Sequence, residues 1–141
     1  MDIEKLMKSL DNEDNEKLLN LTTLKIQQLN LSVLKELDLT REQTLDLLKK
    51  LNRYIYVDEI NELKYGAYMR WVPLNNPEKI ALTRGGVFCD VKITENGIMI
   101  ICKNIGRTCS HFQVKMDECL VFRKLTDQEQ VLLSALDHLS K

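Results

Sequence analysis

Three cysteines and a histidine in the second half of the chain could supply the ligands of a structural zinc ion: Cys102, Cys109, His111 and Cys119. Such sites usually draw their ligands from close Cys-x2-Cys pairs on tight turns, and the chain contains no such pair. Strand alternation also puts Cys102 and Cys119 on apolar faces, and His111 on the face opposite to that of Phe112. We therefore expect free, buried thiols in a reducing compartment, and no cofactor.

A second group of residues could bind RNA or DNA. Strand alternation directs Trp71 inward, toward a core, and Tyr68 and Arg70 outward, where a ring could stack on a base and a cation could bind phosphate. Clustered cations on a small β-module are the electrostatic footprint of nucleic-acid binding. The alternatives are a solvated face, or a face that docks an acidic partner or the chain's own acidic helices. The candidate residues are Tyr68, Arg70, Lys92, Lys103, Arg107 and Lys115.

Signatures of common enzymes are absent from the sequence. There is no P-loop, GxGxxG, HExxH or GxSxG pattern, and the chain has only 2 histidines. Asp117 and Glu118 are adjacent at an expected hairpin tip, so their carboxylates would not converge on a substrate. We therefore expect a protein without catalytic residues.

Composition divides the 141 residues into unlike parts. Residues 1–63 contain 16 leucines and no Gly, Pro, Cys, Trp or Phe, whereas residues 64–125 contain all 5 glycines and only 4 leucines. The first part carries 9 basic and 13 acidic residues, the second 10 and 5, and residues 126–141 carry 1 and 3. This pattern predicts a basic β-module between acidic helical regions.

The leucine-rich part should form a small helical bundle. From Leu18 to Leu39 two apolar stripes occur at helical spacing, which indicates a wide buried face or a break near residues 30–32. Thr40 to Gln43 has the form of a capping box and opens a helix to about Arg53, with Leu45, Leu48 and Leu51 inward. A further capping box at Thr126 to Glu129 predicts a C-terminal helix with one broad apolar face, formed by Val131, Leu132, Ala135, Leu136 and Leu139.

The β-module should contain about five short antiparallel strands, beginning with Tyr65–Leu74. Asn96–Gly97 lies between alternating runs and predicts a two-residue hairpin that pairs Ile93 with Ile100 and Asp90 with Lys103. A second hairpin is expected across residues 117–118, joining residues 111–116 to residues 119–124. Five strands in this length are typical of an SH3-like or Tudor-like barrel, or of an OB-like one.

The run CLVFRKLTDQEQVLLSALDHL, with KYGAYMRWVPL upstream, resembles small uncharacterised proteins of giant nucleocytoplasmic DNA viruses. The resemblance covers roughly residues 64–139 and includes no diagnostic motif. It implies a virus-encoded protein in the host cytoplasm or the virion, and it assigns no catalytic or binding residue.

The sequence thus predicts an α+β protein: a helical region over residues 1–63, a five-stranded SH3-like barrel over 64–125 and a helix over 126–141 that packs on the barrel or the bundle. No apolar run approaches the roughly 20 residues that span a bilayer, and the acidic start lacks the layout of a secretion signal, so we expect a cytoplasmic protein. The leading hypothesis is a non-catalytic interaction or structural protein that binds another protein, or itself, through its leucine-rich helices or a barrel edge. The alternative is a nucleic-acid-binding adaptor.

Overall fold

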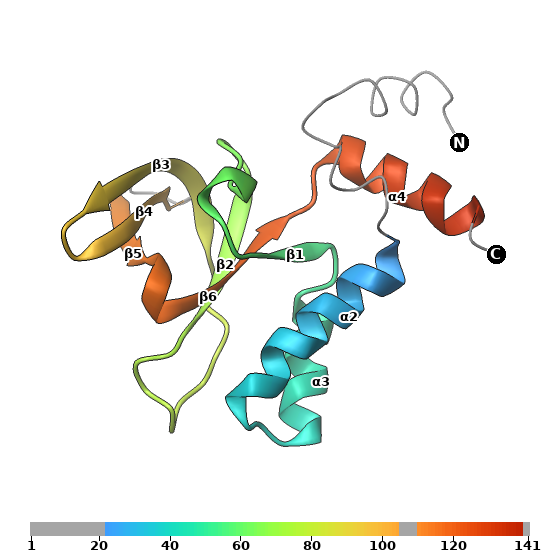
Figure 1. Cartoon of the computed structure of the whole chain (residues 1–141), viewed down its shortest axis with the longest axis horizontal. Coiled ribbons are helices and arrows are strands. Elements are labelled where there is room, and N and C mark those ends of the chain that lie inside the picture. Colours follow the sequence, from blue (N-terminus) through green and yellow to red (C-terminus); the bar gives the residue numbers. More distant parts are fainter. Residues whose placement is uncertain (1–21, 105–109, 140–141) are drawn as a thin grey trace. The chain divides into compact units, whose positions relative to one another are not determined.

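The computed structural model describes residues 22–104 and 110–139, and is α+β (Figure 1). Contacts divide the chain into two compact units. The helical unit comprises the residues up to Ile55 together with those from Leu125 onward, and the sheet unit comprises Tyr56–Lys124. Within the described ranges, no helix is both long enough and apolar enough to cross a membrane.

The helical unit contains helices α2 (Thr23–Leu34), α3 (Arg41–Lys50) and α4 (Asp127–Leu139). Helix α2 begins where the Thr22 side chain accepts a hydrogen bond from the Lys25 amide. It continues as one 3-10 turn, Lys35–Leu37, and ends at Asp38, whose φ of 55° is left-handed. The helix was expected from Leu18 to Leu39; its residues 18–21 lie outside the described residues, and its break falls after Leu34 instead of at residues 30–32.

The buried face of α2 lies between the two stripes that the spacing suggested. Ile26, Asn30 and Leu34 are buried, at i, i+4 and i+8, while Leu24 and Leu29 are exposed. Asn30 occupies an interior position because its side-chain amide donates a hydrogen bond to the Tyr54 carbonyl oxygen at 3.0 Å. The spacing of apolar residues alone therefore misplaced the buried face of α2, because one of the three residues on that face, Asn30, is polar.

Both expected capping boxes are confirmed. The Thr40 hydroxyl accepts from the Gln43 amide, and the Gln43 side chain accepts from the Thr40 amide. Thr126 and Glu129 make the same reciprocal pair at the start of α4. The residues predicted to point inward were only partly correct. On α3 Leu45 is exposed and Leu47 is buried instead, and on α4 Leu139 is exposed and Leu133 is buried instead.

One core of the helical unit joins α2 to α4. Ile26 packs in a cluster with Ile55, Leu125, Leu132 and Leu133. The C-terminal helix thus belongs to the bundle.

The antiparallel sheet has six strands and is open, which corrects the expectation of a closed five-stranded barrel. Its order is β1-β6-β2-β3-β4-β5 (Figure 1). The strands are β1 (Tyr54–Val57), β2 (Tyr68–Pro73), β3 (Gly86–Thr94), β4 (Gly97–Lys103), β5 (His111–Lys115) and β6 (Cys119–Lys124). The additional strand, β1, lies within the range expected to be helical. Its sequence Tyr-Ile-Tyr-Val is β-branched and aromatic throughout, a strand signal that the leucine-rich surroundings obscured.

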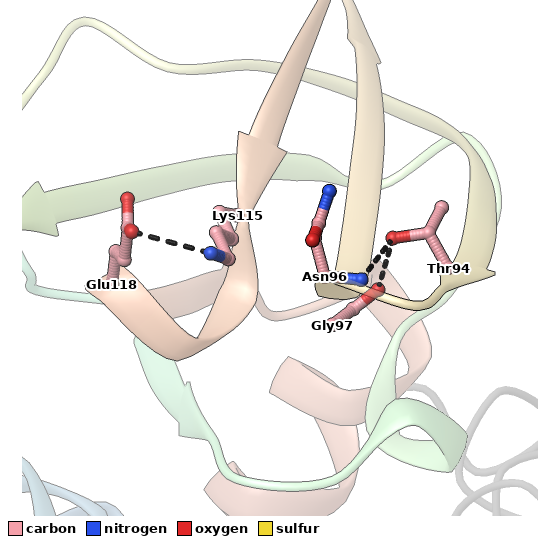
Figure 2. A network of polar contacts seen from close by, with 5 residues as sticks. All are labelled: Thr94, Asn96, Gly97, Lys115 and Glu118. Atoms are coloured by element: carbon pink, nitrogen blue, oxygen red, sulfur yellow. Dashed lines mark hydrogen bonds and ion pairs between the residues drawn. The ribbon is translucent and has the colours of Figure 1, made fainter.

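The β3–β4 hairpin forms, but its register differs by two residues from the expected one. Thr94 pairs with Gly97 and Ile93 with Ile98, so the turn residues are Glu95 and Asn96. Gly97 follows the turn at φ 117°, and the Thr94 hydroxyl donates to its carbonyl oxygen at 2.9 Å (Figure 2). A β-bulge at Cys89 shifts the pairing again, and Asp90 lies opposite Ile101, not Lys103.

The expected hairpin between residues 111–116 and 119–124 is absent. β5 pairs with β4, and β6 pairs with β2, because the 3-10 turn Met116–Glu118 carries the chain away from β5.

The sheet curls over its own apolar face. In a flat sheet β2 and β5 would be ~14 Å apart, since neighbouring strands are ~4.8 Å apart. Yet the Trp71 and Phe112 ring centroids are 5.4 Å apart. Trp71 lies, as expected, in a buried cluster that includes Phe88, Ile100 and Val121.

Candidate functional site

A groove between α2 and α3 is a mostly apolar hollow of the helical unit. It has a volume of about 480 Å³. Leu24 on α2 and Leu45 on α3 are 63% and 47% exposed, and Leu31 and Leu48 lie half-buried between them. Single exposed leucines are common on protein surfaces, but four that line one groove make a continuous apolar patch.

The groove carries positive charge and no carboxylate. Its remaining lining residues are Gln27, Gln28, Lys49 and Asn52. Helix α2 contains one charged residue, Lys25. On α3 the Asp46 carboxylate, which does not line the groove, is 3.1 Å from the Lys50 ammonium group. The groove is therefore complementary to an apolar surface flanked by acidic groups.

Three of the expected nucleic-acid residues share the outer face of β3–β4–β5. The register places Met99 between Lys92 and Lys115 in one cross-strand row. Lys103 lies on the same face, further along β4, between Val87 and His111. Tyr68 continues this second row on β2, opposite Val87. Arg107 lies outside the described residues.

Tyr68 and Arg70 are both engaged by the loop between β2 and β3. The Tyr68 hydroxyl donates to the Arg84 carbonyl oxygen at 2.6 Å, and the Arg70 Nε donates to the Thr83 carbonyl oxygen at 2.9 Å. These bonds hold residues 83–84 against β2, and they engage the Tyr68 hydroxyl and one nitrogen of the Arg70 guanidinium that was expected to bind phosphate. Lys115 makes an ion pair with Glu118 at 3.4 Å, which reduces its share of the basic field (Figure 2).

The structure does not bring together the candidate zinc ligands that it describes. Cys102 lies in the sheet core between Phe88 and Phe112, whereas His111 is exposed on the opposite face of β5. Burial, together with the charge of Cys89, raises the pKa of the Cys102 thiol from its usual 9.0 to about 12. Burial and the charge of Glu118 likewise raise the pKa of Cys119. Cys109 lies outside the described residues. In residues 22–104 and 110–139, no group of three or more His, Cys, Asp or Glu could hold a metal ion.

A second hollow in the helical unit is more enclosed and more polar than the groove. Its volume is about 530 Å³. Residues of α2, α4 and the α3–β1 turn line it, among them Ile26, Leu51, Asn52, Arg53, Leu133, Ser134, Asp137 and His138. Sequence reasoning missed this cavity, because its lining comes from segments more than a hundred residues apart. The one residue in the sequence that could have pointed to this cavity is Arg53, a charged residue between the end of α3 and the start of β1.

Comparison with known proteins gives no match to any family model, to any curated protein or to any solved structure. The function is therefore argued from the geometry of the chain itself.

Proposed function

We propose that the protein is a non-catalytic interaction module that binds another protein through the α2–α3 groove. The observation that supports this proposal best is the exposure of Leu24 and Leu45, 63% and 47%, from the two helices that border one apolar groove. Covering these side chains would remove apolar area from water, at about 25 cal/mol for each Å².

The proposed occupant is an amphipathic helix with apolar anchors at i, i+3 or i+4, and i+7, and with acidic residues beside them. A groove between two helices fits such a helix, whose anchors would pack between Leu24 and Leu45. The acidic flanks follow from the lining, which includes the Lys49 ammonium group and no carboxylate. A second copy of this chain is a competing occupant, and its measurable sign is self-association.

A designed peptide tests the proposal. The probe is a fluorescein-labelled helical peptide with leucines at i, i+4 and i+7 and glutamates between them, and anisotropy measures its binding to the full chain. We expect micromolar binding that changes little with salt, because apolar contacts dominate. The double variant Leu24→Gln/Leu45→Gln should weaken binding at least about tenfold, since burial of a leucine is worth about 1.5–3 kcal/mol.

Ile93→Thr is the matched control, because Ile93 is 78% exposed on β3, in the sheet unit. It should leave peptide binding unchanged. Equal binding by the double variant, or equal binding of a peptide whose leucines are scrambled, would refute the proposal. Sedimentation velocity separates the competing occupant: a dimer that Leu24→Gln/Leu45→Gln dissociates would assign the groove to a second copy.

The shared outer face of β3–β4–β5 supports a second candidate function, nucleic-acid binding. Lys92, Lys103 and Lys115 lie on this face, with the half-buried Met99 and Ile101 between them. Anisotropy against single-stranded RNA and duplex DNA at low and physiological salt tests it. Phosphate-driven binding should fall steeply with salt and should be lost in Lys92→Glu/Lys103→Glu. Arg70 is a poor test position, because its side chain holds the loop. Binding unaffected by these charge reversals would exclude this face.

A further inference from the structure

The second hollow of the helical unit, called the cavity below, combines an apolar wall with one cationic residue. Ile26, Leu51 and Leu133 are buried in its wall, and Arg53 lines it from the α3–β1 turn. A volume of about 530 Å³ lies within the range of pockets that bind small organic molecules. Leu24 and Leu45 of the groove do not line it, whereas Gln27, Leu48 and Asn52 line both hollows.

The backbone at Arg53 is unusual for its residue type. Its φ is 68°, in the left-handed region that glycine and asparagine adopt most easily. This geometry turns the chain from α3 into β1, and the Arg53 carbonyl oxygen accepts a hydrogen bond from the Leu125 amide at 2.8 Å. The turn uses only the backbone of Arg53, so the fold does not require a long cationic side chain here. A strained residue that also lines a cavity is a reason to look for a role of its side chain.

Charge at the cavity favours an anionic guest. The one carboxylate in the lining is that of Asp137, and both of its oxygens already accept hydrogen bonds, from the Thr23 amide at 2.9 Å and the Thr23 hydroxyl at 2.6 Å. The Arg53 guanidinium makes no ion pair with any residue in the described ranges. A guanidinium presents a planar pair of N–H donors that matches a carboxylate.

We propose that this cavity binds a small organic acid, with its apolar body against Ile26, Leu51 and Leu133 and its carboxylate on the Arg53 guanidinium. The proposed ligand is a small molecule instead of a polypeptide, and the residues assigned to it do not line the α2–α3 groove.

Three probes that share one alkyl chain test the proposal on the full chain: octanoate, octanol and octylamine. Isothermal titration and thermal unfolding measure their binding. We expect octanoate to bind with a Kd below about 1 mM and to raise the midpoint of unfolding, and octanol and octylamine to bind at least about tenfold more weakly. Arg53→Asn, which suits the left-handed backbone, should lose the preference for octanoate, while Arg53→Lys should retain part of it.

The control variant is Leu24→Gln/Leu45→Gln, which should bind octanoate as the unchanged protein does. Equal binding of octanoate and octanol would overturn the assignment of Arg53, as would full octanoate affinity in Arg53→Asn. Octanoate binding weaker than about 1 mM by a protein with a normal unfolding transition would overturn the site itself.

Discussion

Asp137, near the end of α4, caps the beginning of α2. Its carboxylate accepts from the Thr23 backbone amide at 2.9 Å and from the Thr23 hydroxyl at 2.6 Å, across 114 residues of sequence. The amides of the first helical turn lack partners within the helix, and the helix dipole favours a negative charge beside them. A side chain from the opposite end of the described chain therefore supplies a cap that is usually local.

Asp137→Asn should destabilise the protein by about 1 kcal/mol, because the amide keeps the shape of the carboxylate and loses its charge. Thr23→Ala removes the hydroxyl partner alone. A double-mutant cycle by urea denaturation should show that the two changes are coupled by at least about 0.5 kcal/mol. Glu78→Gln, at an exposed position in the loop between β2 and β3, is the control for loss of one negative charge away from any helix end. Fully additive effects would mean that the bond between the Thr23 hydroxyl and the Asp137 carboxylate contributes nothing to stability.

The two capping boxes should differ in strength, although their hydrogen bonds are alike. Glu129 is 1% exposed, whereas Gln43 is exposed at the surface. Glu129→Ala leaves the Thr126 amide unsatisfied in a buried place, and should cost about 2–3 kcal/mol. Gln43→Ala exposes the Thr40 amide to water, and should cost at most about 1 kcal/mol. Chemical denaturation of the two variants measures both costs, and equal losses would show that burial does not set the strength of the box.

Local sequence signals predicted where helices and hairpins form better than they predicted which strands pair. Thr40 to Gln43 and Thr126 to Glu129 gave both helix starts correctly, because a capping box involves only residues three apart. The Asn-Gly pair predicted the β3–β4 hairpin but not its register, since Gly97 lies in the first strand pair and not in the turn. The pairing of β6 with β2 could not be read locally, because the 3-10 turn at Met116 redirects the chain.

The candidate site was predicted in part for the same reason. Strand alternation correctly directed Trp71 inward, since a period of two needs no tertiary information. It could not show that the loop at residues 83–84 occupies the polar atoms of Tyr68 and Arg70. The groove and the cavity depend on how helices pack, which spacing within one helix does not determine.

Gly85 and Gly66 offer a matched test of close packing in the loop before β3. Both have left-handed backbones, with φ of 86° and 81°. A Cβ at Gly85 would overlap the Met69 carbonyl oxygen and come within 2.9 Å of the Tyr68 and Arg70 side chains, whereas a Cβ at Gly66 would meet nothing within 4 Å. Gly85→Ala should therefore destabilise the protein by about 1–3 kcal/mol more than Gly66→Ala. Thermal unfolding of the two variants checks this. Equal losses of stability would mean that the loop at Gly85 does not pack against Met69, Tyr68 and Arg70 as closely as described.

Arg53→Gly should keep or raise stability in the absence of any small molecule. Glycine relieves the left-handed strain of about 1–2 kcal/mol, and the greater freedom of the unfolded chain offsets about 0.4–1 kcal/mol of that gain. Urea denaturation should place the net gain in stability between about 0 and 1.6 kcal/mol. A clear loss would instead show that the Arg53 side chain stabilises the fold, and would weaken the case for a binding role.

Cys102 should make stability depend on pH in the alkaline range. Its pKa is raised to about 12 in the folded protein, from the usual 9.0 that applies on unfolding. Its contribution is therefore complete below pH 9.0, and is lost as pH rises from 9.0 toward 12, where the unfolded thiol ionises and the folded thiol does not. The expected slope approaches 1.4 kcal/mol for each pH unit, roughly the free energy of one proton.

Cys102→Ala removes this term and keeps the raised pKa of Cys119, so the difference in unfolding free energy between the two proteins isolates Cys102. Urea denaturation is measured from about pH 8 to about pH 10.5. Near pH 8 the difference in unfolding free energy between the two proteins should not change with pH, and its size reports the cost of the smaller side chain in the core. Above pH 9.0 the advantage of the unchanged protein should shrink steadily. Parallel pH dependences would mean that the folded thiol ionises as readily as the unfolded one, and that the sheet core opens to water at Cys102.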